Sequence, residues 1–411
     1  MPSPHGLVSN GAMTSIARPT PRRSALRLDI TKAQRALVLQ GGGALGAYQA
    51  GVYAGVTEKH KQLDWVAGVS IGAVNAALIA GNPPEKRIER LKEFWHLVSS
   101  SPAQRLPDWA GERTWRNQWS ANAAALFGIP GFFEPRRSPA LLLGGAAPVL
   151  SYYDTTPLQA TLERLVDFDR INDGGIRFSV GAVNVRSGNS VYFDNTRQRI
   201  GPEHIMASGA LPPGFAPVHI EGEDYWDGGI VSNTPLQYVL DTHPRTEPLM
   251  VLQVDLFSAH GDMPRTLAEA MERQKDITYS SRTRMNTDAM ASNMNLQQAI
   301  ADLMARMPER LRKDPAVAAI CAELTHEPIE IVHLIYRDKH HELESKDYEF
   351  SRASVEDHWE AGLRDIRATL NHPELLQEAS QVNGVTTFDL AEPNAHRVRR
   401  PLQLPAVRQA R

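Results

Sequence analysis

The chain contains a single cysteine, Cys321, among its 411 residues. No disulfide can therefore form within it, and no cluster of cysteines can bind a metal. No run of about 18 uninterrupted apolar residues occurs, so no transmembrane helix is expected. Residues 1–24 lack the continuous apolar core of a secretory signal. These absences predict a cytoplasmic protein whose contact with a membrane or a lipid inclusion, if it makes one, is peripheral.

Other functional signatures are also missing. The sequence has no H-E-x-x-H motif, no paired Cys/His cluster and no EF-hand loop. We therefore expect no metal and no cofactor, and no nucleic-acid partner is expected either. The formal net charge is only −3, but both ends are basic: residues 1–33 carry five Arg/Lys against Asp29, and residues 394–411 carry five Arg and no acid. Either these ends are solvated disordered tails, or they contact an anionic surface such as lipid headgroups.

Between these ends, short apolar runs alternate with helical patterns. A hydrophobic content of 42% and a charged content of 22% are typical of a soluble globular protein. Strands are expected at 37–39, 63–70, 217–220, 248–257 and 329–337, with two more within 176–193, and helices at 44–58, 71–81, 83–99, 265–312 and 355–370. Small residues such as Gly51 and Gly55 predict close packing of the first helix on the sheet. This alternation indicates an α/β fold with a mainly parallel sheet.

The first glycine motif has two interpretations. "ALVLQGGGALGAYQAGV", residues 36–52, contains Gly41-x-Gly43-x-x-Gly46 after a short strand. This spacing matches the dinucleotide fingerprint, in which a helix N-terminus faces a pyrophosphate. The same exposed amides could instead hold an oxyanion during ester cleavage.

A second motif favours the oxyanion. Residues 68–72 read Gly68-Val-Ser70-Ile-Gly72, a G-x-S-x-G between an apolar strand and a helix of small residues. This is the context of a nucleophile elbow, whose sharp turn excludes bulk two residues before and after the serine. A dinucleotide site needs an acid at the end of the second strand, whereas Asp64 stands at its beginning.

The group that would activate Ser70 is less evident. Gln40, and not a histidine, precedes the glycines, and neither His219 nor His243 lies in a Gly-rich loop. Asp227-Gly228-Gly229 places a carboxylate at a tight turn, although this tripeptide alone is typical of a plain β-turn.

Taken together, four ordered motifs resemble the patatin-like phospholipase family. They are the glycine loop Gly41 to Gly46, the elbow at 68–72, Ala207-Ser208 with Pro212, and Asp227 to Gly229 followed by Asn233-Thr234-Pro235. The resemblance covers about residues 34–240. One departure is Leu45, where many family members carry Arg or Lys.

The resemblance implies a three-layer α/β/α fold around a central, mainly parallel sheet. It also implies a Ser–Asp dyad in which Ser70 attacks an ester and Asp227 acts as its base. Gly41, Gly42 and Gly43 would form the oxyanion hole, and Gly68 and Gly72 the elbow.

The same resemblance organises the chain. We expect a disordered basic tail at 1–33, a patatin-like catalytic domain at 34–245 with an insertion at about 102–155, a C-terminal α/β extension at 246–380, and a basic, Pro-containing disordered tail at 381–411.

The predicted function is a serine acyl hydrolase acting on lipid or other hydrophobic esters through an acyl-enzyme. One alternative is a non-catalytic lipid-binding or scaffolding protein with the same fold, and a dinucleotide-binding oxidoreductase is a remoter one. Phospholipids, neutral lipids, polyesters and thioesters all remain open as substrates.

The insertion contains an apolar stretch at 121–153. Phe127, Ile129, Phe132 and Phe133 form one cluster and Leu141 to Leu143 another, with Arg136 and Arg137 between them. These residues either complete the core beside the sheet or form a lid or interfacial patch that rests on aggregated lipid.

Overall fold

The computed structural model describes residues 33–59, 62–101, 113–136, 150–244, 246–324, 327, 329–337, 346–371 and 385–389. The predicted tails at 1–33 and 381–411 lie outside these residues except for Ala33 and 385–389. Arg137 and the cluster Leu141 to Leu143 also lie outside them. No helix in the described part of the chain is long and apolar enough to cross a membrane.

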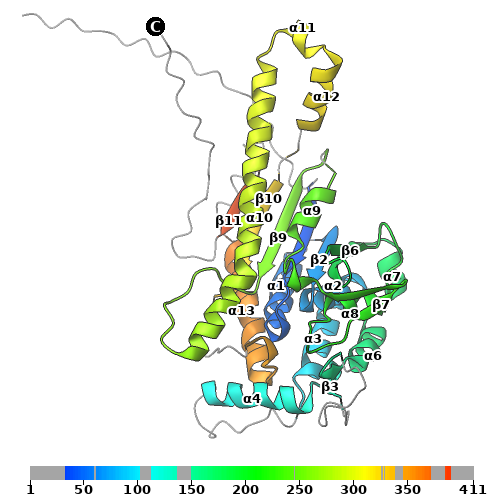
Figure 1. Ribbon diagram of the computed structural model, residues 1–411, viewed down its shortest axis with the longest axis vertical. Coiled ribbons are helices and arrows are strands. Elements are labelled where there is room, and N and C mark those ends of the chain that lie inside the picture. The colour runs from blue at the N-terminus through cyan, green and yellow to red at the C-terminus, as the bar shows by residue number, and fades with distance from the viewer. Residues whose placement is uncertain are drawn as a thin grey trace, which may run out of the picture.

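A nine-stranded sheet forms the centre of the protein (Figure 1). Its order is β11-β10-β9-β1-β2-β5-β8-β7, and β6 also pairs with β5. The strands are β1 (Gln34–Leu39), β2 (Trp65–Val69), β5 (Arg177–Asn184), β6 (Ser190–Asp194), β7 (Val218–Ile220), β8 (Glu223–Asp227), β9 (Leu249–Asp255), β10 (Ile329–Ile335) and β11 (Val385–Asp389). All pairs from β11 to β5 are parallel, whereas β6, β7 and β8 pair antiparallel. The predicted mainly parallel sheet is confirmed.

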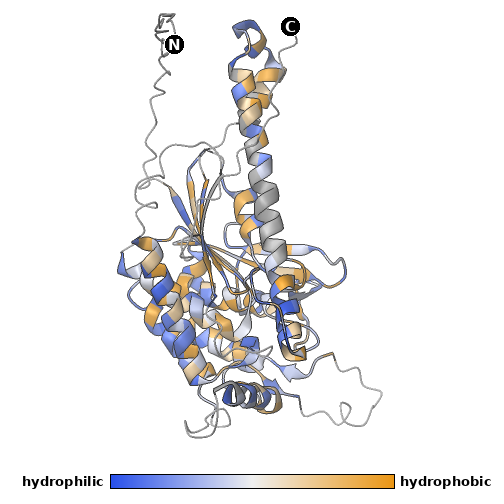
Figure 2. Ribbon diagram, turned by 90° about the vertical axis from the view of Figure 1, so that its left-hand side faces the viewer, coloured by the Kyte–Doolittle hydropathy of each residue, from blue (hydrophilic) through white to orange (hydrophobic). Residues whose placement is uncertain are grey.

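Helices cover both faces of this sheet. Alternate residues of β1 point into different cores: Leu37 and Leu39 join a large cluster with α1 (Gly46–Glu58), α2 (Ile71–Ala80) and α3 (Arg87–Val98), whereas Ala36 and Val38 join a smaller cluster with α9 (Leu236–Thr242). Figure 2 shows hydrophobic residues concentrated in the central strands, with helices of mixed character around them. The three-layer α/β/α architecture is therefore confirmed.

The first helix packs more closely than the sequence suggested, and on a different partner. A Cβ at Gly51 would overlap the carbonyl oxygen of Trp359, and one at Gly55 would overlap Ile366. Both of these residues belong to α13 (Arg352–Leu370). The prediction that these glycines pack on the sheet is wrong, because the side of α1 that carries them packs against α13.

The remaining elements complete the two halves of the chain. The first half adds η2 (Gly43–Leu45), α4 (Arg113–Phe127), β3 (Glu134–Pro135), β4 (Tyr153–Asp154), α6 (Thr156–Leu165), α7 (Phe168–Asn172), α8 (Pro202–Ser208) and η4 (Gly228–Ile230). The second half adds α10 (Leu267–Ala305), α11 (Glu309–Arg312), α12 (Pro315–Leu324) and η5 (Lys346–Tyr348). With 39 residues, α10 is about 58 Å long at 1.5 Å per residue, and Figure 1 shows it projecting beyond the sheet with α11 and α12 at its tip.

Two sequence expectations differ from this arrangement. Residues 385–389, placed in a disordered tail, form edge strand β11, which pairs in parallel with β10. The run Val-Thr-Thr-Phe suits a pleated edge, although the flanking sequence lacks any pattern. The insertion, expected to lack periodicity, contains the 15-residue helix α4.

Candidate active site

Ser70 stands at the turn between β2 and α2. Its φ of 56° and ψ of −124° are rare for a residue with a side chain, as expected of a nucleophile elbow. A Cβ at Gly68 would overlap the Gly72 carbonyl, and one at Gly72 would overlap the Leu39 carbonyl. The turn therefore requires both glycines, and it presents the serine at the N-terminus of α2, whose partial positive charge favours an anion.

Asp227 ends β8 and faces this serine. Its carboxylate accepts a hydrogen bond, 2.7 Å long, from the Gly229 N–H, and the Ser70 hydroxyl lies near enough to act on the pKa of Asp227 as a hydrogen-bond donor. Burial raises the pKa of Asp227 to about 6, although both hydrogen bonds act to lower it. The geometry therefore provides a carboxylate more basic than usual, in contact with the Ser70 hydroxyl.

The glycine loop lies beside the same two residues. The Gly41 N–H donates to the Asn233 carbonyl at 3.0 Å, and the Asn233 amide donates back to the Gly41 carbonyl at 2.9 Å. Gly43 has a φ of +56°, and a Cβ there would overlap the carbonyl oxygen of Asp347. The N–H groups of Gly42 and Gly43 donate no hydrogen bond to any residue that the structure describes, so both are available to an oxyanion.

Two residues quoted only as motif members have identifiable roles. The Ser208 hydroxyl accepts from the Ser70 N–H at 3.0 Å and donates to the Gly181 carbonyl at 2.6 Å. It thereby fixes the backbone of the elbow. Asn233 links the glycine loop to the segment that carries Asp227. Their place in the third and fourth motifs was the signal that could have marked them as positioning residues.

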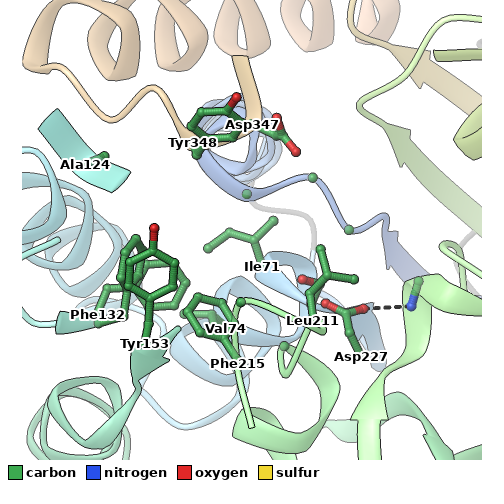
Figure 3. A pocket seen from close by; sticks show the side chains of 18 of the residues that line it. Ile71, Val74, Ala124, Phe132, Tyr153, Leu211, Phe215, Asp227, Asp347 and Tyr348 are labelled. Atoms are coloured by element: carbon green, nitrogen blue, oxygen red, sulfur yellow. Dashed lines mark hydrogen bonds between the residues drawn. The ribbon is translucent and has the colours of Figure 1, made fainter. Parts of the chain in front are cut away.

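A cavity of about 460 Å³ opens at this site. Figure 3 shows Asp227 on one side, Ile71 and Val74 between, and a wall of aromatic rings that includes Phe132, Tyr153 and Phe215 on the other. This size and lining are typical of a site for an apolar ligand. No histidine lines the cavity among the described residues.

The histidines considered in the sequence are occupied elsewhere. His219 is exposed and contacts Asp224 at 3.0 Å. His243 contacts the Gln34 side chain at 2.9 Å and the Glu247 carbonyl at 2.7 Å. Asp64, the candidate ribose ligand, accepts from the Arg35 N–H at 2.8 Å at the opposite end of β2 from Ser70. Over the part of the chain that is described, no three His, Cys, Asp or Glu side chains group as a metal site.

The apolar stretch at 121–153 divides between core and surface. Ile129 and Phe133 are buried, and Phe132 packs against the main core while lining the cavity. Phe127, in contrast, is 65% exposed. The phenylalanine cluster therefore does not form one surface, because its three C-terminal members turn inward towards the sheet.

Two family models and one curated relative name the same family. A family model described as patatin-like phospholipase matches residues 37–240, and one described as patatin phospholipase matches residues 277–382. A patatin-like phospholipase domain-containing protein of Caenorhabditis elegans is 42% identical over 59 residues, which are 14% of this chain and 5% of that protein. The crystal structure of VipD from Legionella pneumophila aligns with a TM-score of 0.32 and 16% identity over 70% of this chain and 61% of that chain. The chain thus spans less than two thirds of each of these relatives.

Proposed function

Since the chain belongs to the patatin-like phospholipase family, we propose that it hydrolyses carboxylic esters of lipids through an acyl-enzyme on Ser70, with Asp227 as the base. The observation that carries this proposal is that Ser70, on the strained turn of the elbow, shares one cavity with the buried Asp227 carboxylate, whose pKa burial raises to about 6. A serine needs an adjacent base to become a nucleophile. Of the two carboxylates that line the cavity, Asp227 lies beside Ser70, whereas Asp347 is paired with Lys275 at 2.8 Å.

The first half of the reaction forms the acyl-enzyme. Asp227 takes the proton of the Ser70 hydroxyl as the serine oxygen attacks the ester carbonyl carbon. The N–H groups of Gly42 and Gly43 then stabilise the tetrahedral oxyanion, a contribution of about 3 kcal/mol for each donor. Asp227 returns the proton to the leaving alkoxide as the carbon–oxygen bond breaks.

The second half releases the acid. Asp227 takes a proton from a water molecule, whose oxygen attacks the acyl carbon, and the proton passes to Ser70 as the acyl–serine bond breaks. A pKa of about 6 leaves Asp227 mostly ionised at neutral pH. It also makes this carboxylate a stronger base than one with an ordinary pKa.

The cavity supports a long apolar substituent on the acyl side. Its aromatic wall begins near Ile71 and Val74, directly after Ser70 on α2. An acyl chain placed there would exclude water from Asp227 and so maintain its raised pKa. We propose the matched region 37–240 as the part that carries all the reacting groups, with residues 34–245 as the catalytic domain.

A fluorophosphonate probe tests this proposal because it reacts only with an activated serine. We expect the protein to be labelled, Ser70→Ala to abolish labelling, and the control Ser99→Ala to leave it intact, since the buried Ser99 hydroxyl donates to the Trp95 and His96 carbonyls and does not line the cavity. Labelling that survives in Ser70→Ala would place the nucleophile elsewhere. A native protein that is neither labelled nor active on a soluble ester would favour the non-catalytic lipid-binding alternative.

A further inference from the structure

Helix α4 carries its large apolar side chains on the face exposed to solvent. Trp115 and Trp119 are 54% and 46% exposed, and Leu126 and Phe127 are 70% and 65% exposed. Trp115, Trp119 and Leu126 recur at a spacing that places them on one side of the helix. The buried side consists of small residues, namely Ser120, Ala121, Ala123 and Ala124. This is the reverse of the usual amphipathic helix, which buries its large apolar residues.

Helix α4 itself forms part of the cavity wall. Asn122, Ala124 and Ala125 line the cavity, and the Tyr153 hydroxyl donates to the Ala125 carbonyl at 2.9 Å. Figure 3 places Ala124 near the aromatic wall. Of these lining residues Ala124 is buried, whereas Asn122 and Ala125 are exposed, so the exposed apolar side chains stand on a helix that borders the cavity.

The exposed apolar surface continues onto the next element of the rim. Leu150 and Tyr152 are 66% and 56% exposed. The Tyr152 N–H donates to the Pro213 carbonyl at 3.2 Å, which joins this segment to the loop that contains Leu211. Leu211 lines the cavity and is 39% exposed. We define the α4 surface as the exposed apolar side chains on these two elements, namely Trp115, Trp119, Leu126, Phe127, Leu150 and Tyr152.

The charge of α4 complements an anionic surface. Its sequence contains Arg113 and Arg116 and no acidic residue. Trp115 lies between the two arginines and Trp119 follows them, and the two tryptophan rings stack with a centroid distance of 6.3 Å. Helices that lie in a membrane interface combine basic residues with Trp, Leu and Phe in this way, and tryptophan is favoured at such interfaces because its ring is apolar with one polar edge.

We propose that the α4 surface is the docking surface for an anionic lipid bilayer, from which a lipid ester enters the cavity beside α4. This inference rests on the proposed lipid esterase function. Figure 1 shows α4 lying across the end of the molecule opposite the α10–α12 hairpin, so docking through α4 leaves the hairpin away from the bilayer. Partition of the tryptophans, Leu126 and Phe127 into the acyl region supplies the apolar part of the affinity, and the net positive charge of the α4 sequence attracts the anionic headgroups.

The test measures binding separately from catalysis. In a Ser70→Ala background, the protein is sedimented with vesicles of equal parts phosphatidylglycerol and phosphatidylcholine. The double substitution Trp115→Ser/Trp119→Ser should weaken binding by about tenfold or more. The matched control Leu303→Ser/Leu311→Ser changes two side chains that are 65% and 49% exposed, at the far end of the hairpin, and should leave binding unchanged. Trp115→Phe/Trp119→Phe should retain most of the affinity.

With Ser70 present, the serine double variant should hydrolyse a soluble short-chain ester at the native rate, but esters in the vesicles more slowly. Vesicle binding that is unchanged in this variant, or equally weakened in the hairpin control, would overturn the proposal. The proposal would also be overturned if sedimentation velocity showed that the native protein is a dimer and that Trp115→Ser/Trp119→Ser is a monomer, since a second copy of the chain would then cover the α4 surface. Failure of the native protein to hydrolyse any ester would reject the proposed function alone, because the binding test uses an inactive protein.

Discussion

Asp227→Asn should abolish activity and yet stabilise the folded protein at neutral and alkaline pH. Burial raises the pKa of Asp227 from 3.8 to about 6, so the folded state binds its proton more tightly than the unfolded state does. Each unit of pKa difference corresponds to about 1.4 kcal/mol. The ionised carboxylate therefore costs the folded protein about 3 kcal/mol above pH 6.

The sign of the pH dependence follows from this difference. Below the unfolded pKa the group is protonated in both states and there is no cost. As pH rises from about 4 to about 6, the unfolded state loses the proton first, so the free energy of unfolding falls. An asparagine keeps the acceptor for the Gly229 N–H but never ionises. The variant should therefore match the native protein near pH 4 and exceed it by up to about 3 kcal/mol at pH 8.

Urea unfolding at several pH values measures this difference in the free energy of unfolding. Asp194→Asn is the control, because its free energy of unfolding should change in the opposite direction. Asp194 is fully buried, and although burial would raise its pKa, hydrogen bonds from Arg177, Thr196 and Ser179 hold that pKa below its ordinary value. Asp194→Asn should therefore be destabilised at pH 8, with a smaller loss in acid. An Asp227→Asn variant that is destabilised at pH 8, or stabilised equally at all pH values, would refute the assignment of a desolvated carboxylate.

The native protein should lose activity as pH falls from about 6 to about 4, the range in which protonation of Asp227 raises its free energy of unfolding. If Asp227 acts as the base, kcat/KM for a soluble ester should rise with pH through a single ionisation near 6 and level off above it. Activity that is unchanged down to pH 4 would exclude Asp227 as the base.

Two further substitutions probe the support of the glycine loop. Gly43→Ala should lower kcat by about 100-fold with little change in KM, because the added Cβ would overlap the Asp347 carbonyl and displace the N–H groups proposed to bind the oxyanion. The control Gly188→Ala should stay active, because Gly188 has a similar φ of +71° but no neighbour within 4 Å. Lys346→Met should lower the free energy of unfolding by about 3–5 kcal/mol in urea titrations, because it leaves two carboxylates of α10 without the buried ammonium that they contact at 3.0 and 2.8 Å. Lys313→Met removes an exposed i,i+4 pair and should have almost no effect.

Local patterns were sufficient to predict the fold class and the family. The elbow at 68–72 and the apolar runs of β1, β2 and β9 are short, continuous signals, and the structure confirms the strand–turn–helix order that they predicted. The assignment of Ser70 and Asp227 as the reacting pair stays a prediction. The two residues share one cavity but stand 157 residues apart in the sequence, so their pairing was inferred through the family resemblance.

Other features had signals that pointed the wrong way. Helix α4 was missed because its large apolar residues face solvent, so no buried stripe marks it as an ordinary helix. The residues of β8, Glu223–Asp227, read Glu-Asp-Tyr-Trp-Asp and four of the five are only half-buried. This run lacks the apolar pattern of a buried strand, so the sequence did not predict it. Gly51 and Gly55 suggested contact with the sheet because their actual partner, α13, lies about 300 residues later in the sequence.

Gln40 shows why the C-terminal half cannot be separated from the site. Its side-chain oxygen accepts from the Leu256 N–H at 2.6 Å and the Phe257 N–H at 3.2 Å, and its amide donates to the Tyr279 carbonyl at 3.3 Å. The residue directly before the glycines is therefore held by the segment after β9 and by α10, and Gly43 lies directly against Asp347 of η5. β9 also pairs along the whole of β1, so without it β1 would be an exposed apolar edge. All the proposed reacting groups lie before residue 245, but the loop that would bind the oxyanion is positioned from beyond it, and the two parts of the chain therefore form one catalytic unit.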